Sequence, residues 1–96
     1  MKYRKKSLVV EALRFDGSVS SAAKICKWAN EYSTMPDGDP WIDYVTIDGV
    51  TAEDFLVHSL EGIMEVAQGD WVIKGIKGEF YPCKQDIFGA TYEAVG

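Results

Sequence analysis

The chain has 96 residues and a formal net charge of −5, with 47% apolar and 26% charged residues. A chain this short buries only about 60–65% of its unfolded surface, so residues 1–96 are expected to form a single domain around one core. The apolar and charged fractions are ordinary for globular proteins and argue against a disordered chain, except at its ends.

The charge is unevenly distributed. Residues 1–30 carry seven Lys or Arg against two acids, and residues 66–96 carry three Lys against four acids. Between them, residues 31–65 carry nine acids and no Lys or Arg; we call this segment the acidic block. A pI near 4.7 and an acidic middle disfavour duplex nucleic acid as a partner, whereas a small anionic ligand held by a few Lys stays open.

Cys26 and Cys83 are the two cysteines of the chain. The start of the chain is basic, but only three apolar residues precede Glu11, so no signal peptide is predicted and a location in a reducing cytoplasm is expected. Two free thiols are the interpretation favoured over a disulfide. No apolar stretch approaches the roughly 18 residues that cross a membrane, and no membrane association is expected.

In chain order, Leu8 to Phe15 is predicted to be a strand with apolar residues on both faces, which is typical of a position inside a sheet. Val19 to about Tyr32 follows the helical apolar spacing, and Ser18 or Ser20 is the expected cap. Residues 33–40 contain two prolines and are expected to form a loop, and Trp41 to Ile47 is the next expected strand.

Asp48-Gly49 is a favoured hairpin turn, although residues 51–54 leave either a bulge or a loop open. A second hairpin is expected from residues 55–60 and 63–67, followed by two strands around a Lys77-Gly78 turn. Residues 86–90 suit one helical turn, and residues 91–95 are predicted to be a strand beside the first. The expected fold is α+β: a bent antiparallel sheet or partial barrel of about five to seven strands with one amphipathic helix packed on it.

No constellation of catalytic residues is visible. His58, the single histidine, has no nucleophile at an identifiable spacing, and Cys83 has a neighbouring lysine but no motif with a base. The two cysteines lie too far apart for a paired zinc motif, and a solvated acidic face explains the aspartates better than a calcium loop does. The aspartates concerned are Asp37, Asp39, Asp43 and Asp48. No enzymatic activity, metal or cofactor is therefore expected.

Aromatic and lysine residues are interleaved in the last third of the chain. Aromatic rings that stack on a base, beside ammonium groups that meet phosphates, are the equipment of a nucleotide site. The candidate ligand-binding residues are Trp71, Lys74, Lys77, Phe80, Tyr81 and Lys84. The alternative is a core tryptophan beside solvated lysines, because Trp71 and Lys74 point to opposite faces of a strand.

The two ends of the chain resemble a known family. The residues concerned are Tyr3-Arg4-Lys5-Lys6-Ser7-Leu8-Val9-Val10-Glu11-Ala12, Gly69-Asp70-Trp71-Val72-Ile73-Lys74-Gly75, Gly78-Glu79-Phe80-Tyr81-Pro82-Cys83-Lys84 and Asp86-Ile87-Phe88. In these stretches the chain is similar to small proteins that are common in bacteriophage and prophage genomes. The resemblance implies a phage-encoded protein that acts in an infected bacterium.

Two functions are compatible with these observations. The first is a non-enzymatic binding protein that sequesters a nucleotide-derived bacterial immune signal. The alternative is a protein-interaction module, a phage accessory or virion-associated protein that meets a basic host or phage protein through the acidic block. A homo-oligomer, with a dimer as the commonest form, is also expected, because the chain has more large aromatic residues than one small core covers. The expected interface residues are Trp28, Trp41 and Tyr44.

Overall fold

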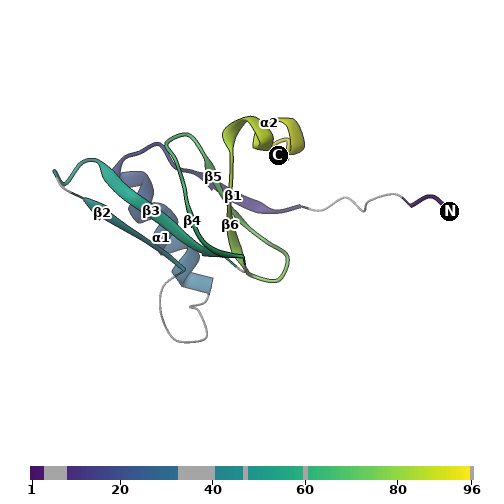
Figure 1. The fold of residues 1–96 in the computed structure, drawn as a ribbon, viewed down its shortest axis with the longest axis horizontal. Helices are drawn as coiled ribbons and strands as arrows, with labels where there is room; N and C mark the ends of the chain where they lie inside the picture. The colour runs from purple at the N-terminus through teal and green to yellow at the C-terminus, as the bar shows by residue number, and fades with distance from the viewer. Residues whose placement is uncertain (4–8, 33–40, 47, 60, 96) are drawn as a thin grey trace.

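The computed structural model describes residues 1–3, 9–32, 41–46, 48–59 and 61–95 (Figure 1). Within these residues the chain forms six strands and two helices, in the order β1(Glu11–Arg14), α1(Val19–Tyr32), β2(Ile42–Thr46), β3(Ala52–Ser59), β4(Gly62–Glu65), β5(Trp71–Lys74), β6(Phe80–Cys83) and α2(Gln85–Thr91). The predicted α+β class is confirmed.

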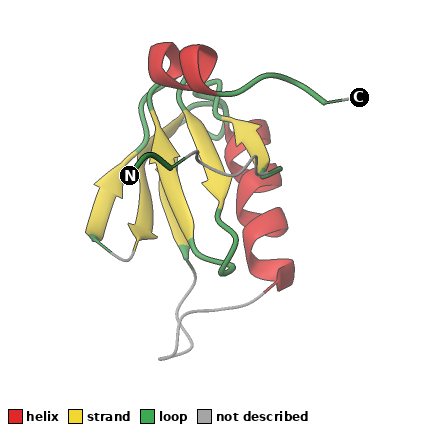
Figure 2. Ribbon diagram, turned by 90° about the vertical axis from the view of Figure 1, so that its right-hand side faces the viewer, coloured by secondary structure: helices red, strands yellow, loops and turns green. Residues whose placement is uncertain are grey.

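The strands divide into two antiparallel sheets of three strands each. One sheet has the order β1-β5-β6, and the other has the order β2-β3-β4. The sheets are not continuous with each other through backbone pairing of the described strands, and no barrel closes. The prediction of a single bent sheet or partial barrel therefore describes the arrangement only loosely. α1 runs along one side of the strands, and α2 lies at one end of them (Figure 2).

α1 begins and ends where the apolar spacing predicts. Ser18 caps it, since the Ser18 Oγ accepts a hydrogen bond from the Ser21 backbone N–H at 3.1 Å. The Asp16 carboxylate in turn accepts from both hydroxyls, at 2.5 and 2.6 Å, and from the Ser18 backbone N–H at 2.9 Å. These hydrogen bonds lower the pKa of Asp16 to about 2.

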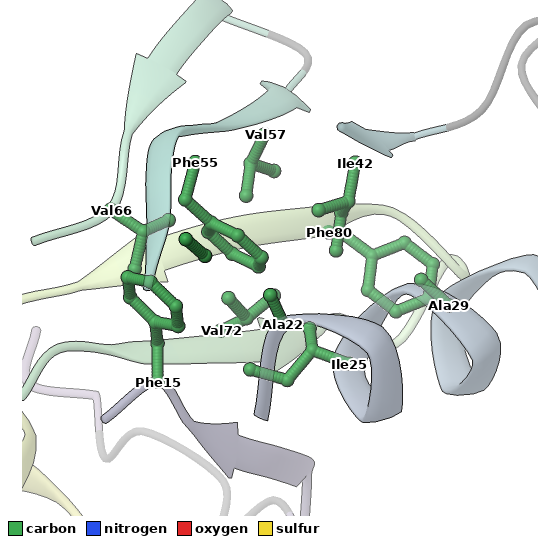
Figure 3. Close-up of a cluster of buried hydrophobic side chains, with 11 residues drawn as sticks. Phe15, Ala22, Ile25, Ala29, Ile42, Phe55, Val57, Val66, Val72 and Phe80 are labelled. Atoms are coloured by element: carbon green, nitrogen blue, oxygen red, sulfur yellow. The ribbon is translucent and has the colours of Figure 1, made fainter. Parts of the chain in front are cut away.

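A single apolar core joins α1 to both sheets (Figure 3). Phe15, just after β1, stacks on Phe55 of β3 with ring centroids 4.3 Å apart. Val72 and Phe80 bring β5 and β6 into the same cluster, and neither side chain is exposed. The buried members are Phe15, Ala22, Ile25, Ala29, Ile42, Ala52, Phe55, Val57, Val66, Val72 and Phe80. The two sheets and α1 thus depend on one another for burial.

β3 contains a bulge, one of the two alternatives that the sequence leaves open. Asp43 and Val45 of β2, two positions apart, pair with residues of β3 that are three apart, so β3 holds one extra residue. Asp54 within this step has a φ of 48°, in the left-handed region. Because of the extra residue, Ala52 and Phe55 both face the core although an odd number of positions separates them.

Asp70 joins the end of the β1-β5-β6 sheet to α2. Its carboxylate is 4% exposed and accepts hydrogen bonds from the backbone N–H groups of Ala67 and Gln85, at 3.2 and 3.3 Å. The Lys84 ammonium lies 3.1 Å from the same carboxylate. A buried carboxylate requires such partners, and here they fix the start of α2.

Three expectations need correction. β1 lies at an edge of its sheet and not inside it; its two apolar faces reflect cover on both sides, since Leu13 packs on the core and Ala12 lines a pocket beside α2. The predicted strand over residues 91–95 is absent: α2 extends to Thr91, and residues 92–95 pair with no described strand. A second helix, of seven residues, replaces the expected single turn.

Some expectations lie outside the described residues, namely the first residue of the predicted initial strand, the 33–40 loop and Ile47. The three predicted hairpins, β2-β3, β3-β4 and β5-β6, are all confirmed. None of the helices within the described ranges is long and apolar enough to cross a membrane.

The bulge predicts an unusual response to glycine. Asp54→Gly should raise the free energy of unfolding by about 0.5 kcal/mol, because glycine adopts positive φ without a steric penalty. Glu53→Gly, the matched control one position earlier, should lower it by about 1 kcal/mol through lost strand preference. Urea unfolding measures both. A fall of equal size in the two variants would contradict the positive φ of Asp54.

Candidate functional site

The six residues expected to bind a ligand do not gather in one place. Phe80 is fully buried in the core, where Trp28 meets its ring edge-on at a centroid distance of 5.2 Å. A ligand has no access to it. Phe80 is therefore withdrawn from the candidate ligand site, and its role is to hold β6 against α1.

The pairing of β5 with β6 places the remaining residues on different faces. Lys74 pairs with Phe80, so both belong to the face that packs toward α1. Ile73 pairs with Tyr81, and Trp71 lies two positions from Ile73, so these three share the opposite face. Trp71 and Tyr81 are thus separated by the sheet from Lys74.

The three lysines are also far from equivalent. The Lys74 ammonium lies 3.6 Å from the Glu11 carboxylate on the neighbouring strand, and Lys84 is paired with Asp70 at the other end of β5. Lys77 is exposed in the turn between β5 and β6. Two of the three ammonium groups thus have carboxylate partners, and the lysines do not form one cationic site.

An aromatic pocket lies where Trp71 meets α2. The Trp71 ring stacks on Phe88 with a centroid distance of 4.1 Å and an interplanar angle of 8°, and Phe88 stacks on Tyr92 at 5.0 Å. These rings line a hollow of about 250 Å³ together with apolar residues of both chain ends. The pKa of Tyr81 is raised to about 12 by burial and by its hydrogen bond with Tyr92.

The three expected interface residues pack against the protein's own core. Trp28 and Trp41 contact Phe80, with centroids 5.2 and 6.1 Å away, and Tyr44 lies 6.3 Å from Phe55. All three are half-buried in the single chain. Much of the aromatic surface that suggested association is therefore covered by other residues of the same chain. The homo-oligomer remains a prediction.

The acidic block folds into one structural unit. All three strands of the β2-β3-β4 sheet come from residues 42–65, which contain no Lys or Arg. Every acid of the block within the described residues is exposed. These acids are Glu31, Asp43, Asp48, Glu53, Asp54, Glu61 and Glu65. The sheet therefore carries a charge that its own strands do not neutralise.

Register determines which carboxylates share a face. Asp43, Leu56 and Glu65 are neighbours across the three strands, and Val45 pairs with Glu53. His58 pairs with Ile63 on the same side. We call this side of the sheet the acidic face; its residues are Asp43, Val45, Glu53, Leu56, His58, Ile63 and Glu65. On the opposite side Ile42, Ala52, Phe55 and Val57 are buried, whereas Met64 of β4 is exposed.

The acidic face is mixed in character. Val45 and Ile63 are 53% and 63% exposed, so apolar side chains stand between the carboxylates. His58 is its one basic side chain, and its Nε2 lies 3.4 Å from the Asp43 Oδ2. The solvent-facing side of an antiparallel sheet is usually polar. Exposed β-branched residues between acids are more typical of a contact surface.

Neither thiol has the surroundings of a nucleophile. Burial raises the pKa of Cys26 to about 11, with a further contribution from the Asp43 carboxylate. Burial also raises the pKa of Cys83, assisted by the carboxylates of Asp70 and Asp86. In the described part of the chain, no group of three or more His, Cys, Asp or Glu residues is arranged to hold a metal ion.

Comparisons with protein-family models, with curated proteins and with solved structures return no match for this chain.

The acidic face was only partly visible in the sequence. Nine acids without a cation were noted, but their gathering on one side depends on the β3 bulge and on the pairing of β2 with β4 through β3. The aromatic pocket had no comparable signal in the sequence, because Phe88 and Tyr92 lie outside the strands.

The raised thiol pKa values predict slow alkylation. At about pH 8, both cysteines should react with iodoacetamide more slowly than free cysteine, because less of each thiol is ionised. The rate at Cys26 should still be rising above pH 10. Mass spectrometry of the alkylated peptides measures each site, with urea-unfolded protein as the control. Reaction at either site faster than in the unfolded chain would reveal an activated thiol.

Proposed function

We propose that this chain is a non-enzymatic binding protein that docks onto a basic surface of a partner protein through its acidic face. One observation carries the proposal: the acidic block forms a complete sheet, with one side packed on the core through β2 and β3 and the other side presenting exposed carboxylates that no Lys or Arg of the sheet neutralises. Carboxylates held on a sheet keep fixed spacings, as a surface that recognises a particular partner requires.

The composition of the acidic face supports a protein partner. Like-charge repulsion disfavours nucleic acid, which carries one negative charge per phosphate. The exposed apolar residues Val45 and Ile63 supply contact area that a purely charged surface lacks. The carboxylates at Asp43, Glu53 and Glu65 would then contribute mainly to selectivity and association rate.

The biological setting is part of the same proposal. The resemblance of the two chain ends to small phage and prophage proteins favours a phage-encoded protein acting in the cytoplasm of an infected bacterium, on a host or phage protein. A small domain with a rigid charged face suits stoichiometric binding, since it needs only to cover its target.

Neutralising the acidic face should abolish partner binding. We expect native protein used as bait in infected bacterial cells to retain a stoichiometric basic partner, and the triple variant Asp43→Asn, Glu53→Gln, Glu65→Gln to lose it. With the purified pair, raising the salt concentration from about 50 to 200 mM should weaken binding by about tenfold, because screening shortens the range of the charges.

The matched control changes the same number of charges elsewhere. Glu31→Gln, Asp86→Asn and Glu93→Gln remove three exposed carboxylates outside the acidic face, and this variant should bind as the native chain does. Equal loss in both variants would show a response to net charge alone. Retention of the partner by the first variant would refute the acidic face as the contact.

A second candidate function is favoured by the aromatic pocket. Trp71, Phe88 and Tyr92 form a stack beside a hollow large enough for a base, and Arg14, paired with Trp71 across β1 and β5, supplies a cation on the same face. This arrangement supports capture of a nucleotide-derived immune signal, with Arg14 taking the place that the dispersed lysines were expected to fill.

Calorimetry with a panel of nucleotides and cyclic dinucleotides tests this second function. Binding should be weakened in Tyr92→Ala, by about 1–3 kcal/mol for one stacked base, because Tyr92 ends the stack and lines the hollow; it should be retained in Lys77→Ala, a control in the distant turn. The bound ligand should be recovered intact after heat release of the protein. A panel without binding, or a ligand recovered in cleaved form, would remove non-enzymatic capture from consideration.

A further inference from the structure

β4 is an edge strand, and among the described strands none is hydrogen-bonded to its outer side. Its four residues are all exposed, and in the described part of the chain its one strand partner is β3. Bonded and non-bonded pairs alternate along an antiparallel ladder, and Val66 donates to Phe55 at 2.9 Å. Met64 is therefore bonded to β3, whereas the backbone N–H and C=O groups of Ile63 and Glu65 point away from it.

Proteins normally protect such an edge, and the comparison with β6 is informative. Pro82 lies in β6 at the outer edge of the other sheet, where proline removes a donor and discourages strand pairing. β4 has neither proline nor lysine in Gly62–Glu65. Its edge offers two outward donors and two outward acceptors to another extended segment.

A pocket of about 340 Å³ lies beside this edge, between β4 and β6. Met64 and Pro82 contribute apolar wall, and Glu61 and Glu79 also line the pocket. The Glu79 carboxylate accepts a hydrogen bond from the Lys77 backbone N–H at 3.0 Å, which leaves Glu61, among the described residues, as the pocket acid whose carboxylate has no such backbone partner. An apolar wall with acidic groups matches a lysine or arginine side chain, whose methylenes prefer apolar contact while the charged head meets a carboxylate. The pocket and the edge thus favour the same kind of occupant.

We propose that a basic extended segment of the partner adds to β4 as a fourth strand and places a Lys or Arg side chain in the pocket between β4 and β6. This inference rests on the proposed function and specifies the manner of binding: main-chain hydrogen bonds at Ile63 and Glu65 extend the sheet, and charge selects the sequence. A second copy of this chain is a poorer occupant, because pairing β4 with itself would bring its own acids together.

The probe is a capped synthetic peptide, Lys-Val-Lys-Val-Lys-Val-Lys, compared with the same peptide N-methylated at alternate amides. N-methylation keeps the charge but blocks extension of the ladder. In amide hydrogen exchange of native protein, the plain peptide should slow exchange of the Ile63 and Glu65 N–H groups by at least about fivefold, since each gains a hydrogen bond. The methylated peptide should leave exchange at these amides unchanged.

A pair of variants tests the same edge from the protein's side. Ile63→Pro removes an outward donor without breaking the ladder to β3, and should weaken binding of the plain peptide by about fivefold. Ile63→Ala keeps the donor and removes the apolar side chain, so it serves as the control for the loss of the side chain. Circular dichroism verifies that both variants fold.

Each outcome has a defined meaning. Equal binding of the two peptides, with no protection at Ile63, would overturn strand addition while leaving the acidic face intact as a charged contact. Failure of both peptides to bind, together with failure of the bait to retain a basic protein, would remove the proposed function and the inference together. Protection at Ile63 that rises with protein concentration and without peptide would assign the edge to a second copy and overturn the basic occupant.

Discussion

A segment with nine acids and no Lys or Arg has no cation of its own with which to bury a carboxylate, and this constraint shapes the fold. Each described acid of the block is exposed, so β2 and β3 must turn their acids to water while Ile42, Phe55 and Val57 meet the core. In a regular strand, Ala52 and Phe55 would point to opposite faces of the sheet, because they are three positions apart. The extra residue at Asp54 restores the phase, and the left-handed backbone there follows from that need.

The rest of the chain supplies what the acidic block lacks. Phe15 just after β1, Ile25 of α1 and Phe80 of β6 close the core over the buried residues of the sheet. Among the described residues the one buried carboxylate, Asp70, lies outside the block, where Lys84 and two backbone N–H groups are within reach. The β1-β5-β6 sheet and α1 thus supply the side chains that cover the core side of the acidic block. The acidic face is left available for contact.

Sequence reasoning succeeded where a local period determines the structure. The spacing in α1 predicts its bounds, and turn residues predict all three hairpins. It failed where the answer depends on neighbours distant in the chain. The apolar residues on both faces of β1 predicted a position inside a sheet. An edge strand that packs between the core and α2 also has cover on both of its faces, and β1 is such a strand.

The candidate sites show the same limit. Trp71 and Lys74 are close in sequence, but strand alternation places them on opposite faces of the sheet. Phe80 is buried in the core because of the register in which β6 pairs with β5. The acidic block was visible as composition. Its organisation into one face required the bulge in β3 and the pairing of β3 with two partners, which no local pattern encodes.

The most direct test of this account asks whether the carboxylates of the acidic face serve the fold or the contact. Unfolding free energies of the native chain and of the Asp43→Asn, Glu53→Gln, Glu65→Gln variant should be compared at about 10 mM and at about 1 M salt. The account predicts that the variant is the more stable at low salt, because repulsion among the acids is relieved, and that the difference disappears at high salt. A variant less stable than the native chain at both salt concentrations would contradict it, since the carboxylates would then be holding the sheet together.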